Sequence, residues 1–198
     1  MTNQAPSLKI IMAQVFATAA HAAVEQKRKY TGEDYIVHPA EVASIVASFG
    51  GTEAQICAAW LHDTVEDTGV TLDDIRNIFG TEIAELVGWL TDVSKPEDGN
   101  RKVRKRIDKE HTKQAPAEAQ FVKCADLISN TKSITEYDPG FAVTYLQEKQ
   151  NTLDIMHKIA DTPILAEAWK TWKQGKTTLD STRVQEALRK MEDNNRNG

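Results

Sequence analysis

The chain has 198 residues, of which 40% are hydrophobic and 27% are charged, and its formal net charge is -5. This composition is typical of one globular domain with a substantial core, and the acidic balance argues against a broad nucleic-acid or anionic-membrane surface. No apolar run reaches the length of a membrane span, and residues 1–7 lack the features of a signal peptide. The two cysteines, Cys57 and Cys124, lie in apolar segments and indicate buried free thiols. We therefore expect a protein of the reducing cytoplasm.

The first part of the chain has helical periodicity. After Ser7, a good N-cap, apolar residues recur every three or four positions at Leu8, Ile11, Met12, Val15, Phe16, Ala19, Ala22 and Ala23. The basic cluster at 27–29 suits a helix C-terminus through the helix dipole, and contact with phosphate is the alternative. Residues 35–38 precede Pro39 and are predicted to be extended, because residues before proline avoid helical angles.

Further helices follow in order. The spacing predicts one helix after Pro39 that stops at Gly50-Gly51, and another that begins after the cap Thr52 and runs into His62-Asp63. Shorter helices are expected after Thr71 and Thr81. The basic run Arg101–Arg106 is interpreted as a solvated helix face, with a flexible lid as the alternative.

Three prolines divide the rest of the chain. Pro116 opens a long helix that places Asp126 and Asn130 on one face, and Pro139 opens the next helix. Pro163 and Gly175 are expected to delimit two final helices, the second with Val184, Leu188 and Met191.

These patterns predict an all-α protein with a single compact multi-helix domain over residues 1–198. Residues 1–7 are expected to be loosely ordered. Residues 164–198 are expected to form C-terminal helices that pack on the domain or at a subunit interface, so a homo-oligomer is an open alternative. Trp169 and Trp172 are assigned to packing or to that interface rather than to a ligand, and His21 is assigned to a packed or half-exposed position rather than to a ligand.

One short stretch, residues 60–68, carries most of the chemistry. It places His62, Asp63, Glu66 and Asp67 directly after an apolar segment. A cap and salt-bridge cluster at a helix end is the simplest explanation of a His-Asp pair. Buried carboxylates are nevertheless costly unless a cation compensates them, and imidazole with carboxylate is a good ligand set for first-row metals.

The candidate metal ligands come from three separate segments: His38, His62-Asp63 and Asp126. Residue identities alone leave Mn²⁺, Fe²⁺ and Zn²⁺ open. Glu66 follows His62 by four positions and Asp67 follows Asp63 by four. If the helical turn persists, this acidic pair lies one turn along the same face and can position or deprotonate a water molecule.

Several motifs, in this order, resemble the HD-domain metal-dependent phosphohydrolases, and more narrowly the small alarmone hydrolases of the RelA/SpoT homologue group. The matching segments are Gln26-Lys27-Arg28-Lys29, Tyr35-Ile36-Val37-His38-Pro39, Leu61 to Thr68, Phe79-Gly80 and Val122 to Asn130. The ordered set is specific, whereas the His-Asp pair alone is weak.

The resemblance implies hydrolysis of the 3′-diphosphate of guanosine tetra- or pentaphosphate in the stringent response, giving pyrophosphate and GDP or GTP. It implies His38, His62, Asp63 and Asp126 as ligands of a metal, usually Mn²⁺ with other divalent ions as alternatives. It implies Glu66 and Asp67 as the pair that activates water. The nucleotide contacts that it implies are Arg28, Lys29, Tyr35 and Asn130.

The chain departs from the family pattern at Leu127, where lysine is common, and at Ala23, where a histidine is common and His21 is displaced. The choice between guanine and adenine alarmones stays open for this reason. Other HD-type substrates, namely deoxynucleotides and the 2′-phosphate of NADPH, are the alternative. A nucleotide sensor without turnover is a third hypothesis, which the acidic pair beside a full ligand set argues against.

Overall fold

The computed structural model describes residues 6–196, with side chains as far as residue 181. Expectations for residues 1–5, and for the side chains of Val184, Leu188 and Met191, lie outside this part. The helices are α1 (Leu8–Ala23), α2 (Val37–Ser48), α3 (Glu53–Leu61), α4 (Thr64–Asp67), α5 (Leu72–Phe79), α6 (Thr81–Leu90), α7 (Arg101–Gln114), α8 (Ala117–Tyr137), α9 (Pro139–Leu153) and α10 (Pro163–Arg196). Two 3-10 turns, Pro96–Asp98 and His157–Ile159, complete the secondary structure.

Among the residues described, the only β-type pairing is the isolated bridge between Lys27 and Asp34, so the all-α prediction is confirmed. No helix within 6–196 combines the length and the apolar character needed to span a membrane. Cys57 and Cys124 are buried and unpaired, as expected.

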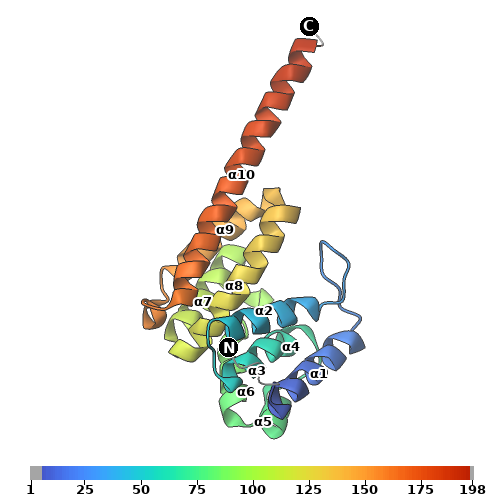
Figure 1. The fold of residues 1–198 in the computed structure, drawn as a ribbon, viewed down its shortest axis with the longest axis vertical. Helices are drawn as coiled ribbons and strands as arrows, with labels where there is room; N and C mark the ends of the chain where they lie inside the picture. Colours follow the sequence, from blue (N-terminus) through green and yellow to red (C-terminus); the bar gives the residue numbers. More distant parts are fainter. Residues whose placement is uncertain (1–5, 197–198) are drawn as a thin grey trace.

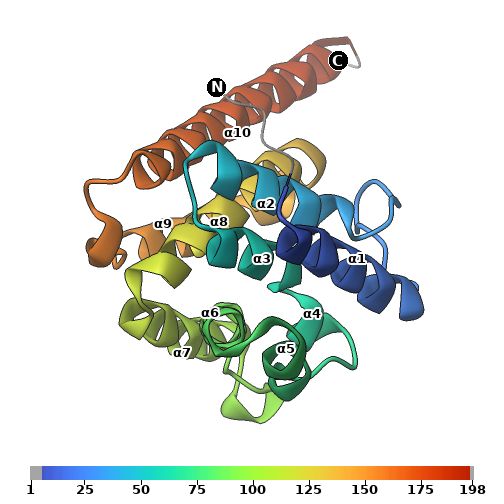
Figure 2. The same cartoon turned by 60° about the horizontal axis from the view of Figure 1, so that its bottom comes forward.

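The helices form a body from which one helix projects. Helices α1 to α6 lie together in one part of the body, and α8 connects them to α9 and α10 (Figure 1). Figure 2 shows α7 beside α6, on the side of the body away from α10. The first half of α10 packs on α8 and α9, and its second half extends beyond them (Figure 1). The core therefore lies around α3 and α8. Helix α3 ends directly before His62, and α8 contains Asp126.

Helix α1 forms where the periodicity predicts it, but it buries a different face. Its buried residues are Ala13, Ala17 and His21, whereas Leu8 is 73% exposed and Val15 is 62% exposed. Small side chains on the buried face let α1 approach α3 closely. Most of the apolar stripe thus lies on the solvent side of this helix, except for Phe16, which packs against Phe79, and His21 is a core residue.

Two predicted boundaries are wrong. Helix α2 begins at Val37, so His38 and Pro39 lie in its first turn instead of in an extended segment. Proline is tolerated there because the first helical N–H groups have no partner within the helix. Gly175 does not end a helix, because α10 continues through it. A Cβ at Gly175 would lie 3.0 Å from the Thr135 side chain, so the glycine permits close packing of α10 on α8.

Candidate metal centre

Three parts of the fold meet at one buried point. His38 comes from the first turn of α2, His62 from the junction of α3 and α4, and Asp126 from the middle of α8. One ligand atom from each of the three lies within 4.8 Å of the others, and all three residues are buried. The tertiary structure therefore brings together side chains that are 24 and 64 positions apart along the chain.

The ring of His62 is fixed by the backbone of its own helix. Its Nδ1 lies 2.8 Å from the carbonyl oxygen of Ala59, which can only accept, so Nδ1 carries the proton. The lone pair of the neutral ring is therefore on Nε2. That nitrogen is buried and has no hydrogen-bond partner among the described residues. A buried acceptor of this kind is typical of a metal ligand.

In the ring of His38 the proton is also on Nδ1, but a different group holds it there. Ser129 Oγ lies 3.0 Å from His38 Nδ1 and 2.8 Å from Glu41 Oε2. The carboxylate of Glu41 takes the only hydroxyl proton, so Ser129 accepts from Nδ1–H of His38. The Nε2 lone pair of His38 then faces Oδ1 of Asp126 at 3.2 Å.

Asp63 lies at the edge of this group. Its Oδ2 is 3.0 Å from His62 Nε2 and 3.7 Å from His38 Nε2. The hydroxyl of Tyr35 donates to the same oxygen at 2.7 Å. Burial and the Asp63 carboxylate together raise the pKa of Tyr35, which keeps it a donor.

The distances and charges suit a cation. With bonds of about 2.1 Å, two ligands of one ion lie no more than about 4.2 Å apart. The distances from imidazole nitrogen to carboxylate oxygen, from 3.0 Å (His62 to Asp63) to 3.9 Å (His62 to Asp126), satisfy this limit. Burial alone would lower the pKa of His62, but the carboxylates of Asp63 and Asp126 outweigh it and raise the pKa to about 9, so without an ion a proton on Nε2 takes the place of the cation. The centre therefore favours positive charge between its histidines and carboxylates.

The two oxygens of Asp126 have different partners. Oδ1 faces the histidines and accepts from Asn130 Nδ2 at 2.6 Å, while Oδ2 lies 3.1 Å from the ammonium group of Lys123. Burial alone would raise the pKa of Asp126, but Lys123 and the histidines hold it well below its usual range. Lys123 was not singled out from the sequence, although its place three residues before Asp126 puts both on one helix face.

The acidic pair continues the helical path beyond the histidine. His62 and Asp63 have angles in the helical region, and α4 begins directly after these two residues. Glu66 accepts a hydrogen bond from the backbone N–H of Asp92 at 2.5 Å. Burial and the Asp92 carboxylate raise the pKa of Glu66 to about 7. Nothing in the sequence pointed to Asp92.

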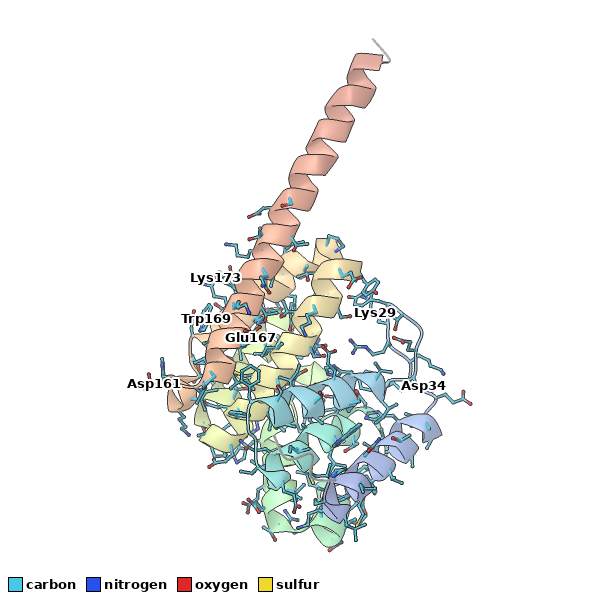
Figure 3. The ribbon with its side chains drawn as sticks, in the orientation of Figure 1. Lys29, Asp34, Asp161, Glu167, Trp169 and Lys173 are labelled. Carbon is cyan, nitrogen blue, oxygen red and sulfur yellow. The ribbon has the colours of Figure 1, made fainter. Side chains whose placement is uncertain are left out.

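Of the remaining candidates, Arg28, Lys29 and Tyr35 lie in the segment between α1 and α2, and Asn130 lies in α8. The guanidinium carbon of Arg28 lies 5.9 Å from the centre of the Tyr35 ring. Lys29 pairs with Asp138 at the end of α8, at 3.2 Å, and lies on the part of the segment near that helix (Figure 3). Asn130 and Tyr35 thus contact metal-centre residues directly, whereas Arg28 contacts Tyr35 and Lys29 points to α8 and α9.

Comparison with known proteins gives a family. The family model described as HD domain matches residues 13–161. A relative from Xenopus tropicalis, named guanosine-3′,5′-bis(diphosphate) 3′-pyrophosphohydrolase MESH1, is 35% identical over 143 residues, which is 70% of this chain and 77% of that protein. A relative from Aquifex aeolicus, named guanosine-3′,5′-bis(diphosphate) 3′-pyrophosphohydrolase, is 46% identical over 87 residues, which is 44% of this chain. The chain spans only 12% of the length of the relatives from Synechocystis and Aquifex.

Two solved structures are similar. A metazoan orthologue of SpoT, described as hydrolysing ppGpp, superposes with a TM-score of 0.75 at 24% identity, over 86% of this chain and 97% of that one. A protein of Listeria monocytogenes superposes with a TM-score of 0.60 at 28% identity, over 73% of this chain and 99% of that one. The fold is therefore shared with both.

Proposed function

The chain belongs to the HD domain family, and on that premise we propose that it removes the 3′-diphosphate of guanosine tetra- or pentaphosphate, releasing pyrophosphate and GDP or GTP. The observation that carries the proposal is the pair of buried Nε2 lone pairs of His38 and His62 that face the carboxylates of Asp126 and Asp63. The names of the relatives from Xenopus and Aquifex support the substrate class.

The ligands that we assign are His38, His62, Asp63 and Asp126. Their mixture of imidazole and carboxylate suits a divalent first-row ion, and we propose Mn²⁺. Such an ion supplies positive charge that offsets the charge that builds up on the phosphoryl group. Ser129 and the carbonyl of Ala59 hold the two imidazole rings in the tautomer that such an ion needs.

Glu66 and Asp67 are the residues that we assign to the attacking water. A pKa of about 7 lets Glu66 take up a proton near neutral pH, as a general base requires. The backbone N–H of Asp92 holds one oxygen of Glu66, which leaves the other free to accept a proton. Asp67, the last residue of α4, orients the water from the adjacent position.

The nucleotide contacts that we assign are Arg28, Lys29, Tyr35 and Asn130. The planar, always charged guanidinium of Arg28 suits stacking on a purine. Lys29 is 71% exposed at its side chain and can exchange Asp138 for a phosphate. Asn130 reaches the centre itself, where its amide can contact the ribose or a phosphate oxygen. The cellular setting that follows is the stringent response in the cytoplasm.

The test uses the full chain loaded with Mn²⁺, guanosine tetraphosphate as substrate and the release of pyrophosphate as readout, with metal content measured on the same sample. We expect release that stops when a chelator removes the ion. No release above the metal-free control contradicts the proposal. An adenosine alarmone, a deoxynucleoside triphosphate and NADPH, assayed in parallel, show whether another phosphate ester is preferred.

A further inference from the structure

A chain of three polar side chains links the core of α1 to the acidic pair. His21 is 1% exposed, and its Nδ1 lies 2.7 Å from Oε1 of Gln26. The Nε2 of Gln26 donates to Oδ2 of Asp67 at 2.9 Å. Residues 21 and 26 belong to the N-terminal part of the fold, whereas Asp67 ends α4. None of the roles given above to site residues uses either His21 or Gln26.

The carboxylate of Asp67 decides which atoms donate and which accept in the hydrogen bonds that link His21, Gln26 and Asp67. An ionised carboxylate such as Asp67 only accepts, so the amide nitrogen of Gln26 must face it. The amide oxygen of Gln26 then faces His21, so Nδ1 of His21 must carry the proton and donate. Reversing either side chain would place two acceptors or two donors against each other. The three residues therefore have one consistent arrangement.

The backbone is shaped to hold Gln26 in this place. Helix α1 ends at Ala23, and Glu25 has a φ of 52°, in the left-handed region that is uncommon for residues other than glycine. The N–H of Gln26 returns to the carbonyl of His21 at 3.2 Å, and its carbonyl accepts from Tyr35 N–H at 3.1 Å. Both ends of the Gln26 backbone are thus held by hydrogen bonds.

Asp67 needs such support because its own helix gives little. Helix α4 has four residues, and Asp67 is an exposed position at its end. Of the carboxylates near the centre, Asp63 is held by Tyr35 and Glu66 by the backbone of Asp92. Gln26 is the corresponding partner of Asp67, and His21 orients Gln26 from the core.

We propose that His21 and Gln26 are positioning residues that hold Asp67 in the geometry that hydrolysis requires. The inference rests on the proposed function, since it assigns a role in that reaction. Neither residue touches the reacting atoms; both act through Asp67. A carboxylate that is displaced or free to rotate orients the water less well, so the loss falls on kcat rather than on binding.

The kinetic test compares Gln26→Ala with Gln14→Ala, which changes an exposed glutamine of α1. We expect Gln26→Ala to lower kcat roughly 10- to 100-fold, with KM and Mn²⁺ content little changed. Gln14→Ala should match the unmodified chain. An unchanged kcat in Gln26→Ala, or a loss of Mn²⁺ that accounts for the lost activity, would overturn the proposal.

Two variants of His21 distinguish a role in positioning Gln26 from a role in packing the core. His21→Leu keeps an apolar side chain in place but cannot donate to Gln26, and should lose kcat as Gln26→Ala does. His21→Asn has an amide nitrogen near the place of Nδ1 and should recover part of that loss. If His21→Asn is no more active than His21→Leu while both fold to the same extent, as shown by circular dichroism, the donor role of His21 is wrong.

A measurement of the His21 tautomer needs no turnover, so it tests this inference independently of the proposed function. In the ¹⁵N spectrum of the metal-loaded protein, His21 should carry its proton on Nδ1, and Gln26→Ala should shift the ring toward the Nε2–H form that free histidine prefers. If the unmodified chain hydrolyses none of the nucleotides, the proposed function fails, and this tautomer shift still supports the hydrogen-bonded chain. An Nε2–H ring in the unmodified chain overturns the inference whatever the activity.

Discussion

The ammonium group of Lys123 lies 3.1 Å from Oδ2 of Asp126, while Oδ1 of the same carboxylate lies 3.2 Å from Nε2 of His38. One carboxylate thus joins a permanent cation on one side to the candidate metal position on the other. Burial alone would lower the pKa of Lys123, but Asp126 and Asp92 outweigh it and raise the pKa above its usual value. Lys123 therefore stays charged and compensates carboxylates that would otherwise be buried without a partner.

Replacing Lys123 with methionine should destabilise the metal-free protein. Removing one member of a buried ion pair leaves its partner uncompensated, and the 23% exposure of the Lys123 side chain reduces the expected loss to about 1–3 kcal/mol. Added Mn²⁺ should recover much of this loss because it supplies the missing positive charge. The measurement is urea denaturation of both proteins with and without Mn²⁺. Lys132→Met, which removes a 60% exposed surface partner of Glu41, is the control. A loss that Mn²⁺ leaves unchanged contradicts the compensation argument.

Ligand and water-activating residues should respond differently to substitution. His38→Ala should lose bound Mn²⁺ and activity together, because it removes a buried nitrogen ligand. Glu66→Gln should retain Mn²⁺ and lose about 10²- to 10⁴-fold in kcat, because the amide cannot accept the proton. Metal analysis and steady-state kinetics on the same samples check both. Equal metal loss in the two variants would show that the division of roles is wrong.

Arg28→Ala should mainly raise KM for the nucleotide. The guanidinium lies 5.9 Å from the Tyr35 ring, and no described hydrogen bond or ion pair joins it to the metal-centre side chains. Its loss therefore removes binding shared by substrate and transition state and leaves kcat nearly unchanged. A fall in kcat at constant KM would instead place Arg28 in the chemical step.

The buried side chain of Lys149 should make the free energy of unfolding depend on pH. It is 1% exposed in α9, and its ammonium group donates to Thr131 Oγ1 at 2.7 Å and to the carbonyl of Leu127 at 3.3 Å. Burial lowers its pKa to about 7, whereas lysine in an unfolded chain titrates near pH 10.4. Between these values the unfolded chain binds more protons, so the free energy of unfolding rises with pH, by at most about 1.4 kcal/mol per pH unit.

The matched variant is Lys149→Met, which keeps most of the length of the side chain and removes the titrating group. The free energy of unfolding of the unmodified chain, minus that of Lys149→Met, should increase from about pH 7 to about pH 10 and stay level below pH 7. Urea denaturation at several pH values measures this difference. Parallel curves for the two proteins would show that Lys149 is charged in the folded state throughout this range.

The sequence predicted which nearby residues share a helix face, because this depends only on their spacing along the chain. Glu66 lies one turn after His62, and Asn130 lies one turn after Asp126 and contacts it directly, as a spacing of four allows. The all-α prediction depends on the same periodicity. The interpretation of Arg101–Arg106 as a helix face is confirmed, since these residues begin α7.

Sequence spacing could not show how distant segments support one another. Ser129 orients His38, and Asp92 holds Glu66, across separations of 91 and 26 positions. Short-range patterns carry no record of such contacts. The sequence also left open whether His21 is packed or half-exposed, because apolar periodicity alone did not identify the face of α1 that meets α3.

The sequence by itself determined the helical elements, the residue types able to hold a cation and the acidic pair one turn beyond, since all of these depend on composition and on neighbours a few positions apart. Only the tertiary structure decided that His38, His62 and Asp126 share one buried point, which protons the histidine rings carry, and that His21 is linked to Asp67 through Gln26. The physical reason is that hydrogen bonds and ion pairs act over a few ångströms in space, and helix packing alone sets which distant residues come that close.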